Sequence, residues 1–100
     1  LKVIQAKSIS DRLFGLNKYK KPVAILLKTR FGIHTFGLSY SIDVLIVSKE
    51  KKVVRMKRSL KPNRFFFWNP RYNVIVELPE GTINRVQIEI NDFINLKLKN

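Results

Sequence analysis

The feature that most constrains the fold is a succession of short apolar runs that are separated by turn residues. Residues 23–28 and 43–48 are continuous apolar runs, a pattern typical of central strands that are covered on both faces. Such runs recur about every 8 to 12 residues, which favours a sandwich or barrel of short strands over alternating strands and helices. Six further strands are expected, over residues 2–6, 33–38, 52–58, 64–68, 73–78 and 93–98.

Helix signals are confined to two short stretches. Ser8 or Ser10 is placed to cap a brief helix that ends near residue 16, and Thr82 is placed to cap a helical turn over residues 82–86. Both stretches are too short to act as crossovers between parallel strands. The sequence therefore predicts a mainly β fold: a compact β-sandwich or barrel-like arrangement with an antiparallel or mixed sheet and one or two short helices.

At this length we expect a single domain over residues 1–100. The strongest signal in its composition is its charge. Twenty Lys and Arg residues against seven Asp and Glu give a formal net charge of +13. Residues 1–76 carry a charge of +14, whereas residues 77–100 carry −1. Such a field concentrates anions and predicts a polyanion or glycan as partner, although lysines also serve to keep a protein soluble. We expect a monomer.

Several functional classes lack support in the composition. There is no Cys, and one His with seven scattered carboxylates offers no ligand spacing for zinc or calcium, so neither a metal nor a cofactor is expected. The longest apolar runs fall far short of the roughly 20 residues that cross a bilayer, so no transmembrane segment is expected. The sequence starts at Leu1 rather than Met and does not fix the compartment: the protein is cytoplasmic, or it is secreted or envelope-associated if a signal peptide was removed before Leu1.

The single histidine and a nearby carboxylate form the candidate catalytic pair. His34 lies nine residues before Asp43, across a polar corner, and an imidazole beside a carboxylate is the arrangement of a general base with its orienting partner. Thr35 or Ser41 would then be the nucleophile, but no Gly-x-Ser-x-Gly elbow is present. The alternative is that Asp43 accepts backbone N–H bonds at a corner and that His34 is a surface or capping residue.

Cations and aromatic rings are mixed in the stretch between residues 55 and 72. In this stretch, which starts at Arg55, the cations Lys57, Arg58, Lys61, Arg64 and Arg71 surround the rings of Phe65, Phe66, Phe67, Trp68 and Tyr72. Single-stranded nucleic acid is bound by such pairings of cations with stacking rings, and sugars stack on rings as well. Consecutive aromatics in a small β protein are more often core, which we expect for Phe65 and Phe67, whereas Trp68 lies at the strand end.

Five ordered segments resemble those of a known family. The central segment, residues 33–44, reads Ile-His-Thr-Phe-Gly-Leu-Ser-Tyr-Ser-Ile-Asp-Val. The others are residues 6–8 with 11–16, 52–54 with 60–62, 76–82 and 91–93. Together they resemble the domain of unknown function 192 family, a widespread group of uncharacterised prokaryotic proteins. Ser41 stands where that family usually has a proline, and Asn91 stands where it usually has a glycine.

The resemblance implies a compact β-sandwich-like domain, often in secreted or envelope-associated proteins, with no established activity. Arg12 and Glu77 are two signature positions of the family. A carboxylate on an apolar face needs a cationic partner, for which Arg12 or Lys61 would serve. We therefore expect Glu77 to form a structural ion pair.

The leading hypothesis is a non-catalytic binding module that recognises an anionic or sugar-containing partner. Its predicted binding residues, gathered where the histidine corner meets the turn at residues 61–62, are His34, Thr35, Asp43, Lys61, Arg64 and Trp68. The first alternative is a hydrolase- or lyase-like enzyme that uses His34 and Asp43. The second is a cell-envelope accessory protein that acts through protein contacts.

Overall fold

The computed structural model describes residues 2–6, 24–30 and 32–98, in which strands predominate. In chain order the elements are β1 (Lys2–Ala6), β2 (Ile25–Lys28), β3 (Ile33–His34), β4 (Ile42–Val47), β5 (Val53–Leu60), β6 (Phe65–Phe66), β7 (Val74–Pro79), α2 (Thr82–Arg85) and β8 (Lys97–Leu98). The prediction of a mainly β fold with short helical structure is confirmed. The helix expected to end near residue 16 lies outside the described residues. Within the described part of the chain, no helix has the length and apolar character that a membrane crossing requires.

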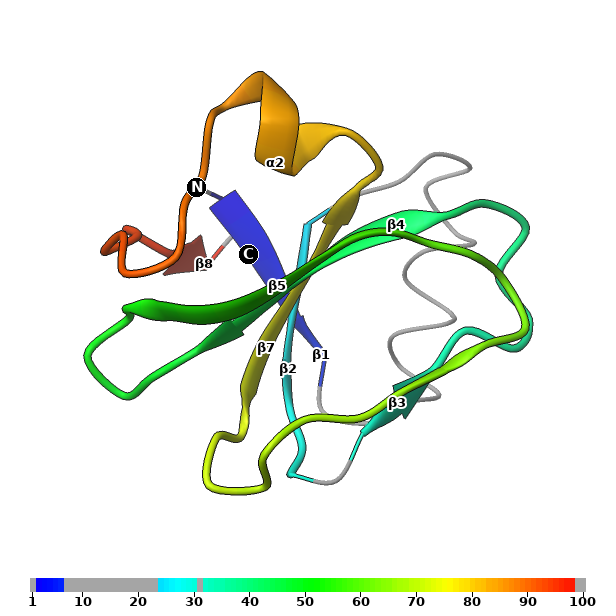
Figure 1. Cartoon of the computed structure of the whole chain (residues 1–100), viewed down its shortest axis with the longest axis horizontal. Helices are drawn as coiled ribbons and strands as arrows, with labels where there is room; N and C mark the ends of the chain where they lie inside the picture. The colour runs from blue at the N-terminus through cyan, green and yellow to red at the C-terminus, as the bar shows by residue number, and fades with distance from the viewer. Residues whose placement is uncertain (1, 7–23, 31, 99–100) are drawn as a thin grey trace.

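Six of the strands form one mixed sheet in the order β5-β4-β7-β2-β1-β8 (Figure 1). β4 lies between β5 and β7 and is antiparallel to both, and β2 is antiparallel to β7. β1 is parallel to both of its neighbours, β2 and β8. The remaining strands, β3 and β6, form a separate antiparallel sheet. The two apolar runs that predicted central strands correspond to β2 and β4, and both lie inside the larger sheet.

Both faces of β4 are covered, which explains its uninterrupted apolar sequence. One core cluster joins it to the two-stranded sheet and includes Ile33, Val44, Ile46 and Phe66. A second cluster joins it to α2 and includes Leu45, Val47 and Ile83. Successive side chains of a strand point to opposite faces, so the two-stranded sheet and α2 cover opposite sides of the larger sheet (Figure 1). Each fully buried side chain of this size stabilises the fold by about 1.5–3 kcal/mol.

The pairing of β3 with β6 decides which aromatic residues are buried. Phe66 and Trp68 are 6% exposed, whereas Phe65 and Phe67 are 61% and 62% exposed. The expectation that Phe65 and Phe67 are core residues is therefore wrong. Four aromatics in a row leave no polar side chain to mark the outer face, so their alternation does not tell which pair faces inward. The pairing of Phe66 with the buried Ile33 places Phe66 on the inner face.

Turn chemistry changes the bounds of two expected elements. β3 ends at His34, four residues earlier than expected, because the chain turns at residues 36–37: the N–H of Leu38 donates to the Thr35 carbonyl at 3.2 Å, and Gly37 has a φ of 90°. α2 begins after Gly81, which has a φ of 89°, and has no side-chain cap. Thr82 was expected to be the cap, but its hydroxyl donates instead to the Pro79 carbonyl at 2.6 Å.

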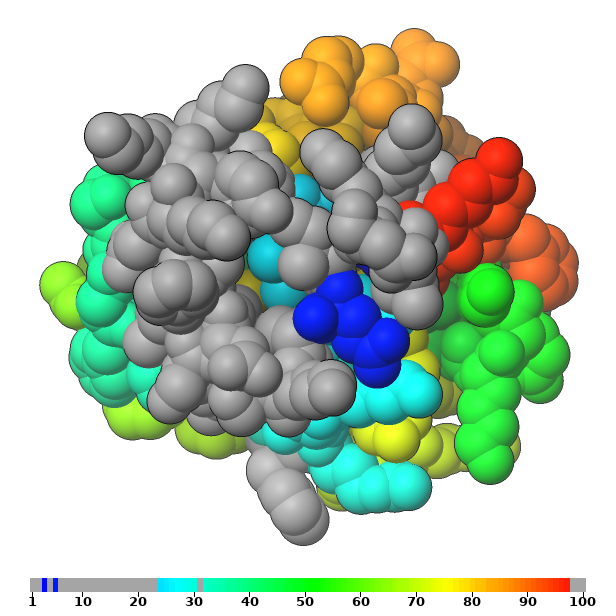
Figure 2. All heavy atoms as spheres, turned by 180° about the vertical axis from the view of Figure 1, so that it is seen from behind, coloured from blue at the N-terminus to red at the C-terminus, as the bar shows by residue number. Residues whose placement is uncertain are grey.

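The C-terminal segment follows the β4–β5 hairpin before it reaches β8. Phe93 forms an isolated bridge with Lys52. Figure 2 shows the hairpin (green) beside this segment (orange to red). Ile94 and Leu96 are partly buried and Asn95 and Lys97 are exposed, the alternation of a strand, although regular pairing in this stretch is confined to β8.

Candidate functional site

Asp43 is a buried structural carboxylate in β4. Its Oδ1 accepts the N–H of Ser59 at 3.0 Å, and its Oδ2 accepts the N–H of Ile83 at 3.0 Å. Ser59 has a φ of 53° and lies where the β4–β5 pairing shifts register, so the first bond holds the irregular end of β5. The second bond attaches the first turn of α2, which has no side-chain cap of its own. The alternative expectation for Asp43, an acceptor of backbone N–H bonds, is confirmed.

Thr35 ties the histidine corner to the turn at residues 61–64. Its side chain is fully buried, and its hydroxyl donates to the Lys61 carbonyl at 2.6 Å while it accepts the Arg64 N–H at 2.9 Å. Its backbone N–H donates to the Arg64 carbonyl at 2.9 Å, and its carbonyl accepts the Asn63 N–H at 3.3 Å. These bonds bring the predicted residues Thr35, Lys61 and Arg64 together, and Thr35 holds the turn that presents the two cations.

His34 and Asp43 each have partners of their own. The Nδ1 of His34 accepts the N–H of Phe36 at 3.2 Å, and the centroids of the two rings lie 5.2 Å apart. Both carboxylate oxygens of Asp43 accept backbone N–H bonds, whereas a catalytic pair needs a carboxylate that orients the imidazole. Catalysis by this pair stays a prediction, to which these contacts add no support.

A hollow lined by cations lies between β5 and the segment that leads into β6. We call it the basic groove; its volume is about 470 Å³, and its lining residues are Arg55, Lys57, Ser59, Leu60, Lys61, Arg64, Phe65 and Phe66. None of these described residues is acidic. The guanidinium of Arg55 is held in place, since its Nη1 donates to the Phe67 carbonyl at 2.8 Å and its Cζ lies 4.7 Å from the Phe66 ring centroid. A guanidinium has five N–H donors, so one such bond leaves donors for an anion.

Three exposed phenylalanine rings and the half-buried ring of His34 lie beside the groove, on the outer side of the two-stranded sheet. We call them the aromatic strip, which comprises His34, Phe36, Phe65 and Phe67. The Phe65 centroid lies 5.1 Å from that of Phe36, with the two rings nearly perpendicular. It lies 5.9 Å from that of Phe67, with the planes 9° apart. Because Phe65 belongs to both the groove and the strip, cations and rings form one continuous surface.

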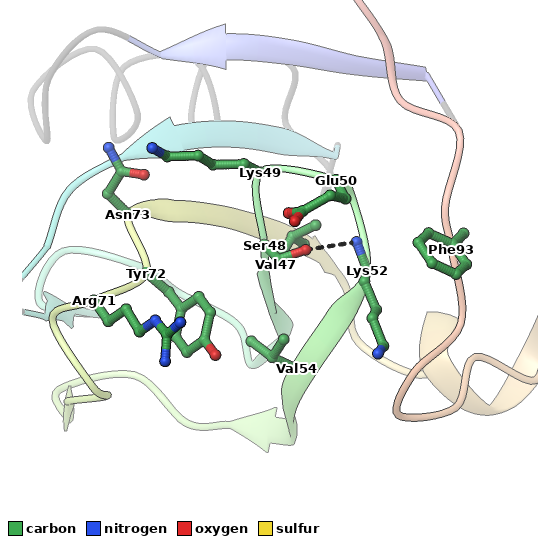
Figure 3. Close-up of a pocket in the computed structure, with 10 residues that line it drawn as sticks. All are labelled: Val47, Ser48, Lys49, Glu50, Lys52, Val54, Arg71, Tyr72, Asn73 and Phe93. Atoms are coloured by element: carbon green, nitrogen blue, oxygen red, sulfur yellow. Dashed lines mark hydrogen bonds between the residues drawn. The ribbon is translucent and has the colours of Figure 1, made fainter.

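A second hollow, of about 550 Å³, lies at the β4–β5 hairpin (Figure 3). We call it the hairpin pocket; its lining residues are Val47, Ser48, Lys49, Glu50, Lys52, Val54, Arg71, Tyr72, Asn73 and Phe93. The Ser48 hydroxyl accepts the N–H of Lys52 at 3.2 Å. The cations of this pocket share it with the carboxylate of Glu50 (Figure 3), so its charge is mixed.

Trp68 and Glu77 lie inside the protein. The Nε1 of Trp68 donates to the Tyr72 carbonyl at 2.8 Å, and its ring centroid lies 5.9 Å from that of Phe66. Trp68 is thus a core residue and not part of the surface that Lys61 and Arg64 share, because strand alternation turns it to the same side as Phe66. Glu77 is fully buried in β7; of its two expected partners, Arg12 lies outside the described residues and Lys61 lines the basic groove.

Several residues that complete the surface formed by the basic groove and the aromatic strip were not among the predicted binding residues. Arg55 and Lys57 are alternate residues of β5, so strand alternation and their charge together could have placed them on one solvent face. For Phe65 and Phe67, the sequence carries no signal that they face outward. Among the described residues, no three His, Asp or Glu side chains are grouped so as to hold a metal ion.

Fold and site together define a small, basic, mainly β domain whose cations gather beside exposed rings. No family model matches the chain. A UPF0127 protein of Thermococcus sibiricus is 34% identical over 67 residues, which cover 67% of this chain and 43% of that protein. A UPF0127 protein of Pyrococcus furiosus is 32% identical over 94 residues, which cover 87% of this chain and 79% of that protein. The chain therefore belongs to the UPF0127 family of uncharacterised conserved prokaryotic proteins, which is equivalent to the domain of unknown function 192 family that it was predicted to resemble.

The chain spans less than half the length of the Thermococcus relative. Two solved structures share its fold. A protein of unknown function from Novosphingobium aromaticivorans has a TM-score of 0.76 at 12% identity, covering 93% of this chain and 73% of that one. A putative transcription regulator from Sinorhizobium meliloti has a TM-score of 0.71 at 17% identity, covering 91% of this chain and 78% of that one. At these identities the likeness establishes the fold alone.

Proposed function

We propose that the chain is a non-catalytic binding module for an anionic partner, which it holds in the basic groove. The observation that carries this proposal is the charge of the lining: two Lys and two Arg side chains, with no acidic residue among the described ones. An anion in the groove is attracted by all four cations without a competing carboxylate. The formal net charge of +13 extends that attraction over the wider surface.

The groove is also shaped before a partner arrives. Thr35 holds the turn that carries Lys61 and Arg64, and Asp43 holds the end of β5. Arg55 is fixed against the Phe66 ring. A preorganised site binds more tightly because less conformational entropy is lost on binding. In this proposal Thr35 and Asp43 position the groove and do not touch the partner.

The proposal is tested by titrating the protein with labelled heparin and a labelled single-stranded oligonucleotide at about 50 and 200 mM salt. Two double variants remove the same charge from different hollows: Lys61→Gln with Arg64→Gln in the groove, and Lys49→Gln with Arg71→Gln in the hairpin pocket. We expect the groove variant to bind both polyanions about tenfold more weakly at the lower salt. The hairpin variant is expected to bind within about twofold of the unmodified chain.

Thermal unfolding followed by circular dichroism establishes that both double variants are folded. If no polyanion binds even at the lower salt, the proposed function is rejected. Equal losses in the two double variants would mean that net charge alone attracts the partner, which would contradict a site in the groove.

A further inference from the structure

We infer that the anionic partner is a single-stranded nucleic acid, with its phosphates in the basic groove and its bases stacked on the aromatic strip. The inference rests on the function proposed above and adds a role for the rings. Single-stranded nucleic acid uses both features at once, since cations neutralise its backbone and ring faces receive its unstacked bases. Phe65 connects the two, because its ring lines the groove and also stacks on Phe67 within the strip.

The strip leaves apolar ring surface open to solvent. Phe65 and Phe67 are each more than half exposed, and Phe36 is 40% exposed. Apolar side chains that cluster on the surface of a small domain mark a place where it contacts something else. Every base has a flat face that stacks on such rings, so this surface is suited to binding with little sequence preference.

The Phe67 ring packs closely against Gly32, next to β3. A Cβ atom at Gly32 would lie 2.6 Å from the Cδ1 of Phe67 and 2.9 Å from the Phe66 carbonyl oxygen, so glycine leaves the ring its space against β3. Arg55 holds the same residue through the bond to its carbonyl. The Gly32 contact at the ring and the Arg55 bond at the backbone thus support Phe67 within the strip.

Two other polyanions fit this surface less well. In a duplex the bases are paired and stacked on one another, so a duplex would engage the cations and leave the rings unused. An acidic glycan carries many hydroxyl groups, which need hydrogen-bonding partners when they lose water. The described residues of the groove and the strip include no carboxylate and no amide side chain for that purpose.

The inference is tested by anisotropy titrations with a labelled oligothymidylate, a duplex of the same length and heparin. Phe65→Ala removes a ring without changing charge. Phe93→Ala is its matched control, because Phe93 is 71% exposed and lines the hairpin pocket. We expect Phe65→Ala to weaken oligothymidylate binding about tenfold, with an unchanged salt dependence, and to leave heparin binding as it was. Phe93→Ala is expected to leave all three affinities unchanged.

The charge variant gives the complementary signature. Lys61→Gln with Arg64→Gln is expected to reduce the slope of log K against log salt by about 0.7 for each phosphate of the single strand that the variant no longer neutralises. It is expected to weaken the binding of every polyanion, whereas Phe65→Ala is expected to weaken the binding of the single strand alone. Phe67→Ala provides a second ring deletion if Phe65→Ala does not fold.

The outcomes separate the inference from the proposed function. Equal affinity for single strand and duplex, or an unchanged oligothymidylate affinity in both ring variants, would overturn the inference while anion binding in the groove stands. A loss confined to heparin in Phe65→Ala would identify an acidic glycan as the partner and overturn the inference as well. If none of the three polyanions binds at the lower salt, both are rejected.

Discussion

The basic groove and the hairpin pocket are hollows of similar volume that are built in different ways. The charges that line the groove are all positive, and its framework includes bonds from Thr35 to Lys61 and Arg64, 26 and 29 residues away along the chain. The hairpin pocket mixes a carboxylate with its cations, and its bond from Lys52 to Ser48 spans four residues. Volume therefore does not identify the site: the smaller hollow has the charge and the framework that suit an anion.

The largest difference in stability between the two hollows is expected when the Thr35 hydroxyl, which holds the turn at the groove, is deleted and compared with deletion of the Ser48 hydroxyl in the hairpin pocket. Thr35→Val keeps the shape of the side chain but leaves the Lys61 carbonyl and the Arg64 N–H without this partner. We expect the free energy of unfolding, measured by urea denaturation, to fall by about 2–4 kcal/mol, and polyanion affinity to fall with it. A decrease below about 0.5 kcal/mol would contradict the role given to Thr35.

A smaller effect is expected from filling the space under the strip. Gly32→Ala places a methyl group against the Phe67 ring and the Phe66 carbonyl, so we expect a loss of about 1–3 kcal/mol in thermal unfolding and weaker oligothymidylate binding. Gly81→Ala is the control. Both glycines have a positive φ that is unfavourable for alanine, 89° at Gly81, but nothing lies within 4 Å of a Cβ added at Gly81. If both variants bind as the unmodified chain does, the position of Phe67 does not matter for binding.

Local patterns in the sequence predicted the strands of the larger sheet, although only the end of the strand expected over residues 93–98 is regular, as β8. Continuous apolar runs predicted β2 and β4, and the strand expected over residues 52–58 covers most of β5, because adjacent residues show whether one or both faces of a strand are buried. The meeting of Thr35 with Lys61 and Arg64 was also expected, since polar turns at the ends of paired strands gather at one edge.

Other features depend on partners that local patterns do not specify. The outward direction of Phe65 and Phe67 follows from the pairing of β6 with β3, and four adjacent aromatics offer no contrast from which to infer it. The second partner of Asp43 is Ile83, 40 residues away. Neither relation could be derived from spacing along the chain.

A modest effect is expected when the guanidinium in the groove is replaced and its charge is kept. Arg55→Lys loses the fixed bond to the Phe67 carbonyl and the stacking on the Phe66 ring. We expect thermal unfolding to report a loss of about 0.5–1 kcal/mol and binding to weaken about two- to threefold, with an unchanged salt slope. Unchanged stability and affinity would show that Arg55 acts as charge alone.

The smallest effect is expected at the hairpin pocket. Ser48→Ala removes one local, partly buried bond to the Lys52 N–H, so the free energy of unfolding is expected to fall by less than about 1 kcal/mol and polyanion affinity to stay the same. An affinity loss as large as that of Thr35→Val would move the binding site to the hairpin pocket.

A chemical-shift map of the isotope-labelled chain, titrated with oligothymidylate, locates the binding surface residue by residue. We expect the largest amide shifts to fall on residues 34–36, 55–57 and 61–67, where the groove and the strip meet. Largest shifts on residues 47–54 and 71–73, with the groove unperturbed, would contradict this expectation.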